Sequence, residues 1–236
     1  MLKINNLVKS YQKGVKAVNG LTLSVNKGEI YGFIGHNGAG KSTTIKAIVG
    51  ALDFNEGEIL IDGVNVKIDP LTCKRNIAFV PDNPDVYEYL TGIQYLNFIA
   101  NLFDVDKKER KARIEKYATL FGLEKNLSQV ISSYSHGMKQ KLVIISALIH
   151  QPKLLVLDEP FVGLDPMATH NLKNIMREFC SEGGAIFFST HVLEVAEKLC
   201  DRVGIIKKGK LIKEGAVSEM AKDKSLEDLF LETADE

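Results

Sequence analysis

Short apolar alternations fill the first 34 residues and predict strands joined by tight turns. The segments "LTLSV" and "EIYGFI" are rich in apolar residues, and "QKGVK" and "NKGE" interrupt the pattern with glycine and polar residues. A period of two places alternate side chains on one buried face, which is typical of strands. A glycine-rich loop then leads to "KSTTIKAIVGAL", which we expect to be helical, and "EILIDG" predicts a further strand.

The pattern changes to helical spacing at about residue 93. One helix face is predicted to carry Leu96, Ile99, Ala100 and Phe103. Helix-rich sequence continues to about residue 150, and strands then alternate with helices again. "KLLVLDEP" and "AIFFST" are nearly continuous apolar runs, as expected of strands buried on both faces of a parallel sheet.

The end of the chain adds a helix and a hairpin. Asp165-Pro166 is typical of a helix N-cap and first residue, and Gly183-Gly184 is expected to close that helix. "VGIIKKGKLIKEG" predicts a hairpin that turns at Lys208-Gly209. The elements predict an α/β fold with a mixed or parallel sheet, an N-terminal antiparallel β subdomain and a helical insertion. We expect one domain over 1–236, with core segments 1–90 and 151–215, a helical subdomain at 91–150 and a helical tail at 216–236.

Composition places the chain among globular proteins with a sizeable core. It has 236 residues, 45% hydrophobic and 25% charged, and 30 Lys+Arg balance 30 Asp+Glu. The zero net charge gives no strong electrostatic case for nucleic acid or an anionic membrane as the main partner. The first residues lack a signal-peptide core, and no apolar run approaches the ~20 residues of a membrane span. Cys73, Cys180 and Cys200 are expected to be reduced thiols without a metal, in a soluble intracellular protein.

A glycine-rich stretch between a predicted strand and a predicted helix matches a phosphate-binding pattern. In "GHNGAGKST", the fixed places of G-x-x-x-x-G-K-S are filled by Gly35, Gly40, Lys41 and Ser42. Glycine lets backbone N–H groups converge on phosphate oxygens at a helix N-terminus, whose dipole favours negative charge. Lys41 is expected to reach the β- and γ-phosphates, and Ser42 to ligate Mg²⁺. The flanking strand and helix favour nucleotide binding over a chance turn.

Two acidic residues, Asp158 and Glu159, follow the buried run "LLVL". The carboxyl edge of an open α/β sheet is where such folds bind ligands. Asp158 is expected to hold Mg²⁺ directly or through water, as strand-end aspartates do in phosphate-loop ATPases. Glu159 points the other way and is expected to address an attacking water. The alternative is a strand-to-turn transition with two solvated acids, which the neighbouring phosphate loop disfavours.

Five motifs in order give the chain a family resemblance. "GHNGAGKST", "YSHGM", "LLVLDEP", "GLD" and "STH" occur with the spacing of ABC-type ATPases, so the sequence resembles the nucleotide-binding subunits of ABC transporters over essentially its whole length. The resemblance implies a phosphate-loop ATPase core, with ATP and Mg²⁺ as ligands. It implies catalytic roles for Lys41, Glu159 and His191, and metal contacts for Ser42, Asp82 and Asp158. It implies nucleotide contacts for Tyr11, Gly35, His36, Asn37, Gly38, Ala39, Gly40, Lys41, Ser42, Thr43, Asp82, Ser135, Gly137, Asp158 and Asp165.

"YSHGM" stands where this family carries its signature, usually L-S-G-G-Q. In the family the serine and second glycine face the γ-phosphate held by the other subunit of a head-to-tail dimer, and Ser135 and Gly137 match those positions. The alternative is a simple helix cap at Ser135. Tyr134, His136 and Met138 depart from the commonest form.

Other positions carried over from the family each have a plainer alternative. Tyr11 lies where an aromatic ring stacks on adenine, or it is an ordinary aromatic of an edge strand. His191 resembles the histidine that contacts the γ-phosphate, or it caps a helix. Asp165 resembles part of the loop that bridges the two subunits. Asp82 replaces the usual glutamine or glutamate, so its shorter side chain favours a water-mediated metal contact, or it is a turn residue in "PDNP".

The segment "FVPDNPDVYEYLTGIQYLNFIANLF" and the tail "SLEDLFLET" look like the branch that powers drug, antibiotic-peptide and polysaccharide exporters. That resemblance implies a separate transmembrane permease and a location on the cytoplasmic face of the membrane. A cytoplasmic helix of the permease is expected to dock on a surface lined by Tyr87, Tyr89, Tyr95 and Phe98. Alternatively, these aromatic residues belong to the core. The alternative is a soluble ABC ATPase without a transporter, such as the type that assists iron–sulfur assembly.

Overall fold

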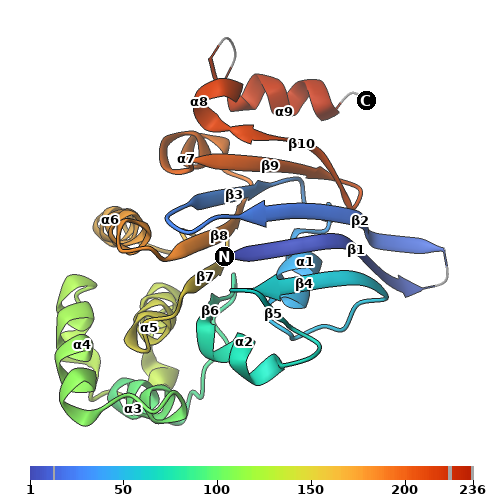
Figure 1. Cartoon of the computed structure of the whole chain (residues 1–236). Helices are drawn as coiled ribbons and strands as arrows, with labels where there is room; N and C mark the ends of the chain where they lie inside the picture. The colour runs from blue at the N-terminus through green and yellow to red at the C-terminus, as the bar shows by residue number, and fades with distance from the viewer. Residues whose placement is uncertain (13, 223–224, 235–236) are drawn as a thin grey trace.

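Two β-sheets with helices around them form the fold of the computed structural model, which describes residues 1–12, 14–222 and 225–234 (Figure 1). The first sheet is antiparallel, with spatial order β2 (Val15–Val25), β1 (Leu2–Gln12), β4 (Glu56–Ile61) and β5 (Val64–Asn65). The second sheet runs in the order β10 (Lys210–Ala216), β9 (Arg202–Lys207), β3 (Ile30–Ile34), β8 (Ala185–Thr190), β7 (Leu154–Asp158) and β6 (Ile77–Val80). Only the pairing of β10 with β9 is antiparallel in this second sheet.

The helices pack around the second sheet, and some of them extend beyond one side of it. The described α-helices are α1 (Lys41–Ile48), α2 (Pro70–Asn76), α3 (Gly92–Leu102), α4 (Lys107–Leu120), α5 (His136–Ile149), α6 (Pro166–Ser181), α7 (Leu193–Leu199), α8 (Val217–Met220) and α9 (Leu226–Ala234). Two single 3₁₀ turns, Glu124–Asn126 and Ile131–Ser133, connect α4 to α5. In Figure 1 the helices α3, α4 and α5 lie together at one end of the molecule, and α8 and α9 lie at the other.

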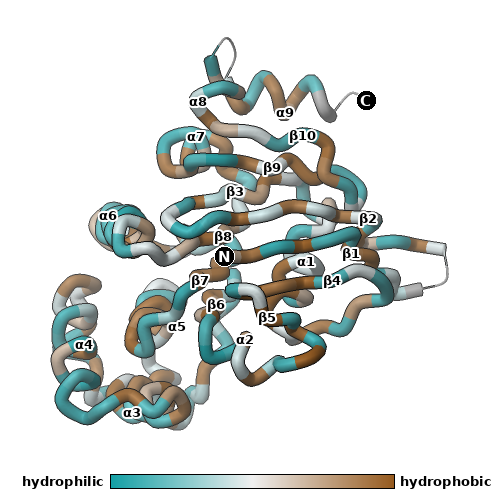
Figure 2. Tube along the Cα trace, in the orientation of Figure 1, coloured by the Kyte–Doolittle hydropathy of each residue, from teal (hydrophilic) through white to brown (hydrophobic). Residues whose placement is uncertain are grey.

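The parallel strands β3, β7 and β8 of the second sheet are buried on both faces, which explains their continuous apolar runs. Alternate side chains of each strand enter two different hydrophobic clusters: Phe187 packs with the side chains between the two sheets, whereas Phe188 packs on the helix-covered face. Tyr31 and Phe187 stack at 5.8 Å between ring centroids. The hydropathy colouring of Figure 2 shows the contrast between these apolar strands and the polar helix α4. Both faces of these three strands are therefore core, whereas the edge strand β10 is largely exposed.

The predicted α/β class, with an antiparallel N-terminal sheet and a parallel core, is confirmed. The helix after the glycine-rich loop is shorter than expected, because it ends at Ile48 and not near Leu52. Gly50, with φ of +68°, turns the chain, and the amides of Gly50 and Ala51 donate to Ala47 and Lys46. This closing turn ends the helix. In the predicted helical tail, Ala216 belongs to β10, and residues 223–224 and 235–236 lie outside the described part.

Within the described ranges, no helix combines the length and apolarity needed to cross a membrane.

Candidate nucleotide-binding site

The predicted site residues gather at the carboxyl edge of the second sheet. The phosphate loop leaves β3, Asp158 ends β7, His191 follows β8, and Asp82 follows β6. The strand register aligns these ends, because Ile34 pairs with Thr190 and Asp158 pairs with Ser189. Segments far apart in the sequence thus meet at one edge of the sheet.

The phosphate loop is held tightly at its ends. Gly35, Ala39 and Gly40 are buried, whereas His36, Asn37 and Gly38 are exposed. At Gly40, φ is +113°, and a Cβ atom would lie 2.5 Å from the backbone oxygen of Ala17. Only glycine fits there, for both conformational and steric reasons. The backbone of the loop therefore has a fixed geometry where it enters α1, and the middle of the loop is exposed.

Lys41 folds back onto the loop that precedes it. Its Nζ atom donates to the backbone oxygens of Gly35, at 2.6 Å, and of His36, at 3.3 Å. The side chain is buried, and this burial lowers the pKa of Lys41, while the nearby carboxylates of Glu159 and Asp158 oppose the shift. The ammonium group therefore stands between the loop and the two acidic residues that were expected to share a site with it.

The first turn of α1 presents two hydroxyl residues, Ser42 and Thr43. Ser42 is exposed, and Thr43 is half-buried with its Oγ1 atom 3.3 Å from the Tyr11 hydroxyl. The Tyr11 residue is 60% exposed. Tyr11 thus lies beside the start of α1 with most of its surface open to a ligand.

The two acidic residues at the end of β7 have different surroundings. Asp158 is buried and accepts a hydrogen bond from the Ser189 hydroxyl at 2.5 Å. Glu159 has a φ of +48°, a strained conformation for a residue with a side chain. Its Oε1 atom lies 2.9 Å from Nδ1 of His191, which is largely exposed. The structure brings Lys41, Asp158, Glu159 and His191 together.

Ser189 was not among the predicted site residues. It belongs to "FFST", where a serine at the end of an apolar buried run is the sequence signal that singles it out. Its backbone oxygen accepts from the Glu159 amide at 3.2 Å, and its hydroxyl binds Asp158. Ser189 therefore positions both acidic residues from the neighbouring strand.

Asp82 lies on the bend after β6 and is exposed. Its position fits the expected place at the sheet edge and also the turn in "PDNP". Its contact with a metal stays a prediction.

The signature segment and the "GLD" loop are in contact within this chain. Ser135 is the N-cap of α5, exposed, and its hydroxyl accepts from the Met138 amide at 3.3 Å. A Cβ atom on Gly137 would lie 2.5 Å from the backbone oxygen of Gly163, and one on Gly163 would lie 2.7 Å from the His136 ring. The two loops therefore pack so closely that neither glycine position has room for a side chain.

Asp165 connects the same two segments through its side chain. It is the N-cap of α6, where it accepts from the Ala168 amide at 2.9 Å, and it pairs with Nζ of Lys141 on α5 at 2.5 Å. The hydrogen bond from Lys141 holds the pKa of Asp165 below its usual range. Lys141 was not predicted, because its partner lies on a different helix.

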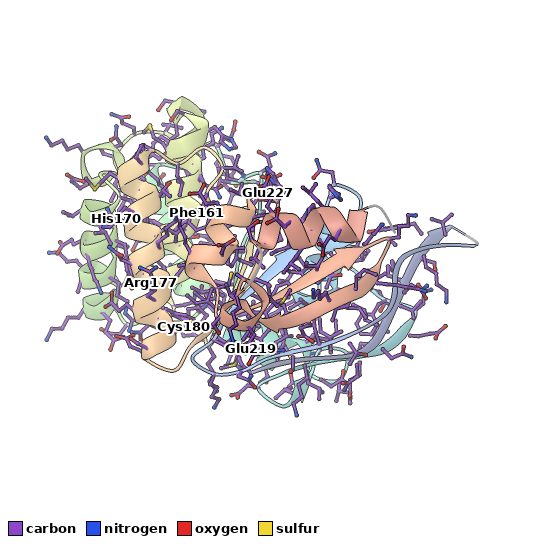
Figure 3. The ribbon with its side chains drawn as sticks, turned by 90° about the horizontal axis from the view of Figure 1, so that it is seen from above. Phe161, His170, Arg177, Cys180, Glu219 and Glu227 are labelled. Atoms are coloured by element: carbon purple, nitrogen blue, oxygen red, sulfur yellow. The ribbon has the colours of Figure 1, made fainter. Side chains whose placement is uncertain are left out.

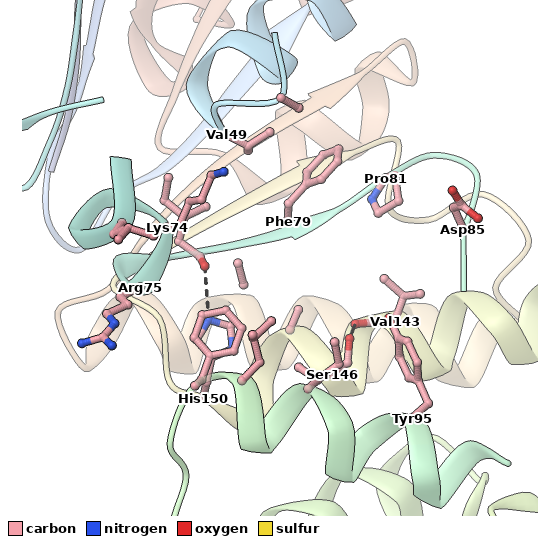
Figure 4. A pocket seen from close by; sticks show the side chains of 18 of the residues that line it. Val49, Lys74, Arg75, Phe79, Pro81, Asp85, Tyr95, Val143, Ser146 and His150 are labelled. Atoms are coloured by element: carbon pink, nitrogen blue, oxygen red, sulfur yellow. Dashed lines mark hydrogen bonds between the residues drawn. The ribbon is translucent and has the colours of Figure 1, made fainter. Parts of the chain in front are cut away.

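A groove of about 740 Å³ lies between the sheet and the helices α3 and α5 (Figure 4). Its apolar wall includes Val49, Leu71, Phe79, Tyr95, Leu102 and Val143. Lys74 and Arg75 lie toward one end of the groove in Figure 4, and Asp85 toward the other. Tyr95 was predicted for the permease surface and lines this groove.

The other predicted aromatic residues lie next to Tyr95. Tyr87 makes ring contacts with Tyr89, Tyr95 and Phe98, with centroid distances of 6.0, 6.4 and 5.5 Å. Tyr87, Tyr89 and Phe98 are exposed. Tyr87, Tyr89 and Phe98 therefore form one exposed aromatic surface beside the groove, whereas Tyr95 is buried in the core.

Comparison with known proteins assigns the chain to a protein family. Residues 18–162 match the ABC transporter family, and the chain belongs to that family as an ATP-binding ATPase subunit. It is 34% identical to the ABC-type transporter ATP-binding protein EcsA of Bacillus subtilis, over 100% of this chain and 97% of that protein. It is 36% identical to the bacitracin transport ATP-binding protein BcrA of Enterococcus faecalis, over 94% of this chain and 71% of that protein.

Solved structures agree with this assignment. An ATP-binding subunit of an ABC transporter superposes with a TM-score of 0.94 at 35% identity, covering 98% of each chain. The dimeric bacterial ABC transporter cassette MJ0796 superposes with a TM-score of 0.84 at 25% identity, covering 92% of this chain and 99% of that one. These relatives are transporter subunits or cassettes, so the soluble alternative is not favoured.

Proposed function

We propose that this chain powers an ABC exporter by hydrolysing Mg-ATP at the edge of its second sheet. The observation that carries this proposal is the convergence of Lys41, Asp158, Glu159 and His191 around one exposed glycine-rich loop. Positioning and charge stabilisation supply most of the catalysis in phosphoryl transfer, so a rigid cluster of this kind is what the reaction needs.

The phosphate loop, residues 35–43, would hold the nucleotide. Exposed backbone at Asn37 and Gly38 and the N-terminus of α1 are suited to phosphate oxygens. Lys41 would exchange its two backbone oxygen partners for the β- and γ-phosphates. Tyr11, largely exposed beside Thr43, would stack on the adenine ring.

The residues present also fit a magnesium ion. The Ser42 hydroxyl and the Asp158 carboxylate supply oxygen ligands, which Mg²⁺ prefers, and Ser189 orients the carboxylate. Asp82 would contribute through water. When bound, Mg²⁺ would neutralise charge on the phosphates.

Glu159 would accept a proton from the attacking water, and His191 would contact the γ-phosphate. Their hydrogen bond of 2.9 Å joins the two roles, because it holds the carboxylate and the imidazole in one orientation. The strained backbone at Glu159 fixes the side chain further.

The second half of the site would come from another ATPase subunit in a head-to-tail dimer. Ser135 and the N-terminus of α5 are exposed, and the Ser135 hydroxyl can face a phosphate in trans. Asp165, on the loop that packs against Gly137, would lie at the subunit boundary. Support comes from the dimeric form of the MJ0796 cassette.

The groove beside α3 and α5 would receive a cytoplasmic helix of the permease, placing the chain on the cytoplasmic face of the membrane. Its apolar wall suits one face of an amphipathic helix. Lys74 and Arg75 at one end would attract the negative C-terminus of that helix, and Asp85 at the other end would attract its N-terminus. The name of BcrA, which links that relative to bacitracin transport, supports an exporter.

Copurification from membranes tests the transporter role. A polytopic membrane protein should accompany the tagged wild-type chain, and a Lys74→Glu, Arg75→Glu variant should lose it while still binding ATP. A matched charge reversal far from the groove, Lys210→Glu, should retain it. If no membrane protein accompanies the wild-type chain from its native membrane, the exporter proposal is wrong, although the ATPase assignment stands.

A further inference from the structure

The C-terminal helix α9 contacts the middle of the phosphate loop. The rings of His36 and Phe230 lie 4.4 Å apart between centroids, at an interplanar angle of 46°. Figure 3 looks down on α9, whose first turn is marked by Glu227, and shows it on the opposite side of the molecule from α4. A residue near the end of the chain is therefore in direct contact with the nucleotide loop.

The middle of the phosphate loop is less well supported than its ends. Gly35 and Gly40 pack against backbone of β9 and β2, at Ile206 and Ala17. By contrast, a Cβ atom on Gly38 would meet nothing within 4 Å. Within the described part of the chain, the exposed middle of the loop makes one ring contact, between His36 and Phe230. The backbone oxygen of His36 also accepts from Lys41, so His36 links α9 to the loop lysine.

Helix α9 is itself anchored to the segment that follows His191. Leu226 and Leu229 are buried in the helix-side core cluster. The Leu226 amide donates to the Glu197 carboxylate at 3.1 Å, and Glu197 belongs to α7. Helix α7 begins at Leu193, two residues after His191. One helix therefore touches both the phosphate loop and the helix that carries the chain away from His191.

We propose that Phe230 is a positioning residue for nucleotide binding, and that α9 braces the phosphate loop through His36. This inference rests on the proposed role of the loop. With the brace in place, the exposed middle of the loop is already ordered before ATP arrives, so binding loses less conformational entropy. Because the two equilibria are linked, ATP binding strengthens the docking of α9 on the loop by the same free energy by which docked α9 strengthens ATP binding.

Phe230→Ala tests the brace. Affinity for ATP, measured by calorimetry in the Glu159→Gln background to prevent turnover, should fall roughly two- to tenfold, the size of one aromatic contact. In the otherwise wild-type chain, the KM for ATP should rise by a similar factor while kcat stays within about twofold, since the group does not touch the reacting atoms. Phe230→Tyr, which keeps the ring, should restore both values.

Leu231→Ala is the matched control, because Leu231 is the next residue on α9 and is 57% exposed. It should leave affinity and KM unchanged. Hydrogen exchange supplies the reciprocal readout: ATP should slow exchange of the backbone amides at 226–232 in the Glu159→Gln protein, and this protection should disappear when Phe230→Ala is added. A purely structural role for Phe230 would lower the melting temperature without changing that ATP-dependent protection.

Two outcomes would overturn the inference. One is an unchanged ATP affinity for Phe230→Ala, and the other is an equal loss for Leu231→Ala and Phe230→Ala. Lys41→Ala separates this result from failure of the site itself. If Lys41→Ala weakens ATP binding and Phe230→Ala does not, the loop assignment stands and the brace is wrong. If neither variant affects binding, the loop assignment is wrong as well.

Discussion

His191 and Glu159 share a hydrogen bond of 2.9 Å that links the ends of two neighbouring parallel strands. Glu159 follows β7 and His191 follows β8, and Ser189 ties the same two strands together through Asp158. The relative positions of the acidic residues and the histidine are thus set by the backbone ladder.

Lys41→Ala should weaken ATP binding and turnover together. The change removes the cation that we place at the β- and γ-phosphates, and it leaves the backbone oxygens of Gly35 and His36 without its hydrogen bonds. Calorimetric titration with ATP and a phosphate-release assay measure the two effects. Lys46→Ala, an exposed lysine later in the same helix, is the control and should behave as wild type. Unchanged affinity and turnover would remove the phosphate-loop assignment.

Glu159→Gln should preserve ATP binding and suppress hydrolysis. The amide keeps the shape of the side chain but cannot take the proton from water, and loss of a general base typically costs about 10²–10⁴-fold in rate. Single-turnover kinetics with saturating Mg-ATP measure the chemical step. A rate near that of the wild type would mean that another group activates the water.

Ser135→Ala should weaken the ATP-dependent dimer when it is combined with Glu159→Gln. As a cap alone, Ser135 contributes about 1 kcal/mol to stability and nothing to ATP chemistry. As a phosphate receptor in trans, it stabilises the dimer that blocked hydrolysis traps. Sedimentation with and without Mg-ATP reports the monomer–dimer equilibrium, and Ser133→Ala is the control. Equally tight dimers with and without the Ser135 hydroxyl would leave it with a capping role only.

Asp82→Asn should shift the apparent Mg²⁺ affinity of the ATPase reaction while leaving the enzyme active. Asparagine keeps the turn-forming chemistry of the bend after β6 but removes the charge. Titration of the rate with Mg²⁺ at saturating ATP measures the shift. If neither the metal dependence nor the rate changes, Asp82 is a turn residue.

Lys141→Met should raise the pKa of Asp165, because Lys141 is the main cause of its depression. A carboxylate with a lowered pKa in the folded state adds stability above its unfolded pKa of about 4, and this contribution is lost as pH falls through the folded value. The wild-type advantage over Lys141→Met should therefore be present at pH 7 and shrink toward pH 3. Carboxyl NMR titration and urea unfolding measure both effects, with the exposed Lys46→Met as control. A constant difference in unfolding free energy across this range would exclude the ion pair as its source.

Elements with strong local patterns could be predicted from the sequence. The strands β7 and β8 are fully buried, so nearly every position is apolar, and the cap at Asp165 with Pro166 has a local signature. The early end of α1 depended on how Gly50 closes the helix, which apolar spacing does not show. Helix α2 was not expected, although Asp69-Pro70 has the same cap signature, because its seven residues show little apolar periodicity.

Some residues of the site could likewise be predicted from the sequence, and others could not. Lys41, Asp158 and Glu159 belong to motifs whose chemistry requires fixed neighbours in sequence, so their meeting at one sheet edge was predictable. Ser189 and Lys141 act across strands or helices, and their roles depend on side-chain directions that only packing determines. The contact of Phe230 with His36 joins opposite ends of the chain, and local propensity carries no information about it.

The hydrogen bonds of Lys41 to its own loop have a consequence for how tightly ATP is held. Because the ammonium group is hydrogen-bonded to Gly35 and His36, we expect nucleotide binding to exchange these partners and to add few new hydrogen bonds at this lysine. These hydrogen bonds also help to hold the loop in its shape. For the same reason we expect release of ADP to be easier, since the carbonyl groups would take the lysine back as the phosphates leave.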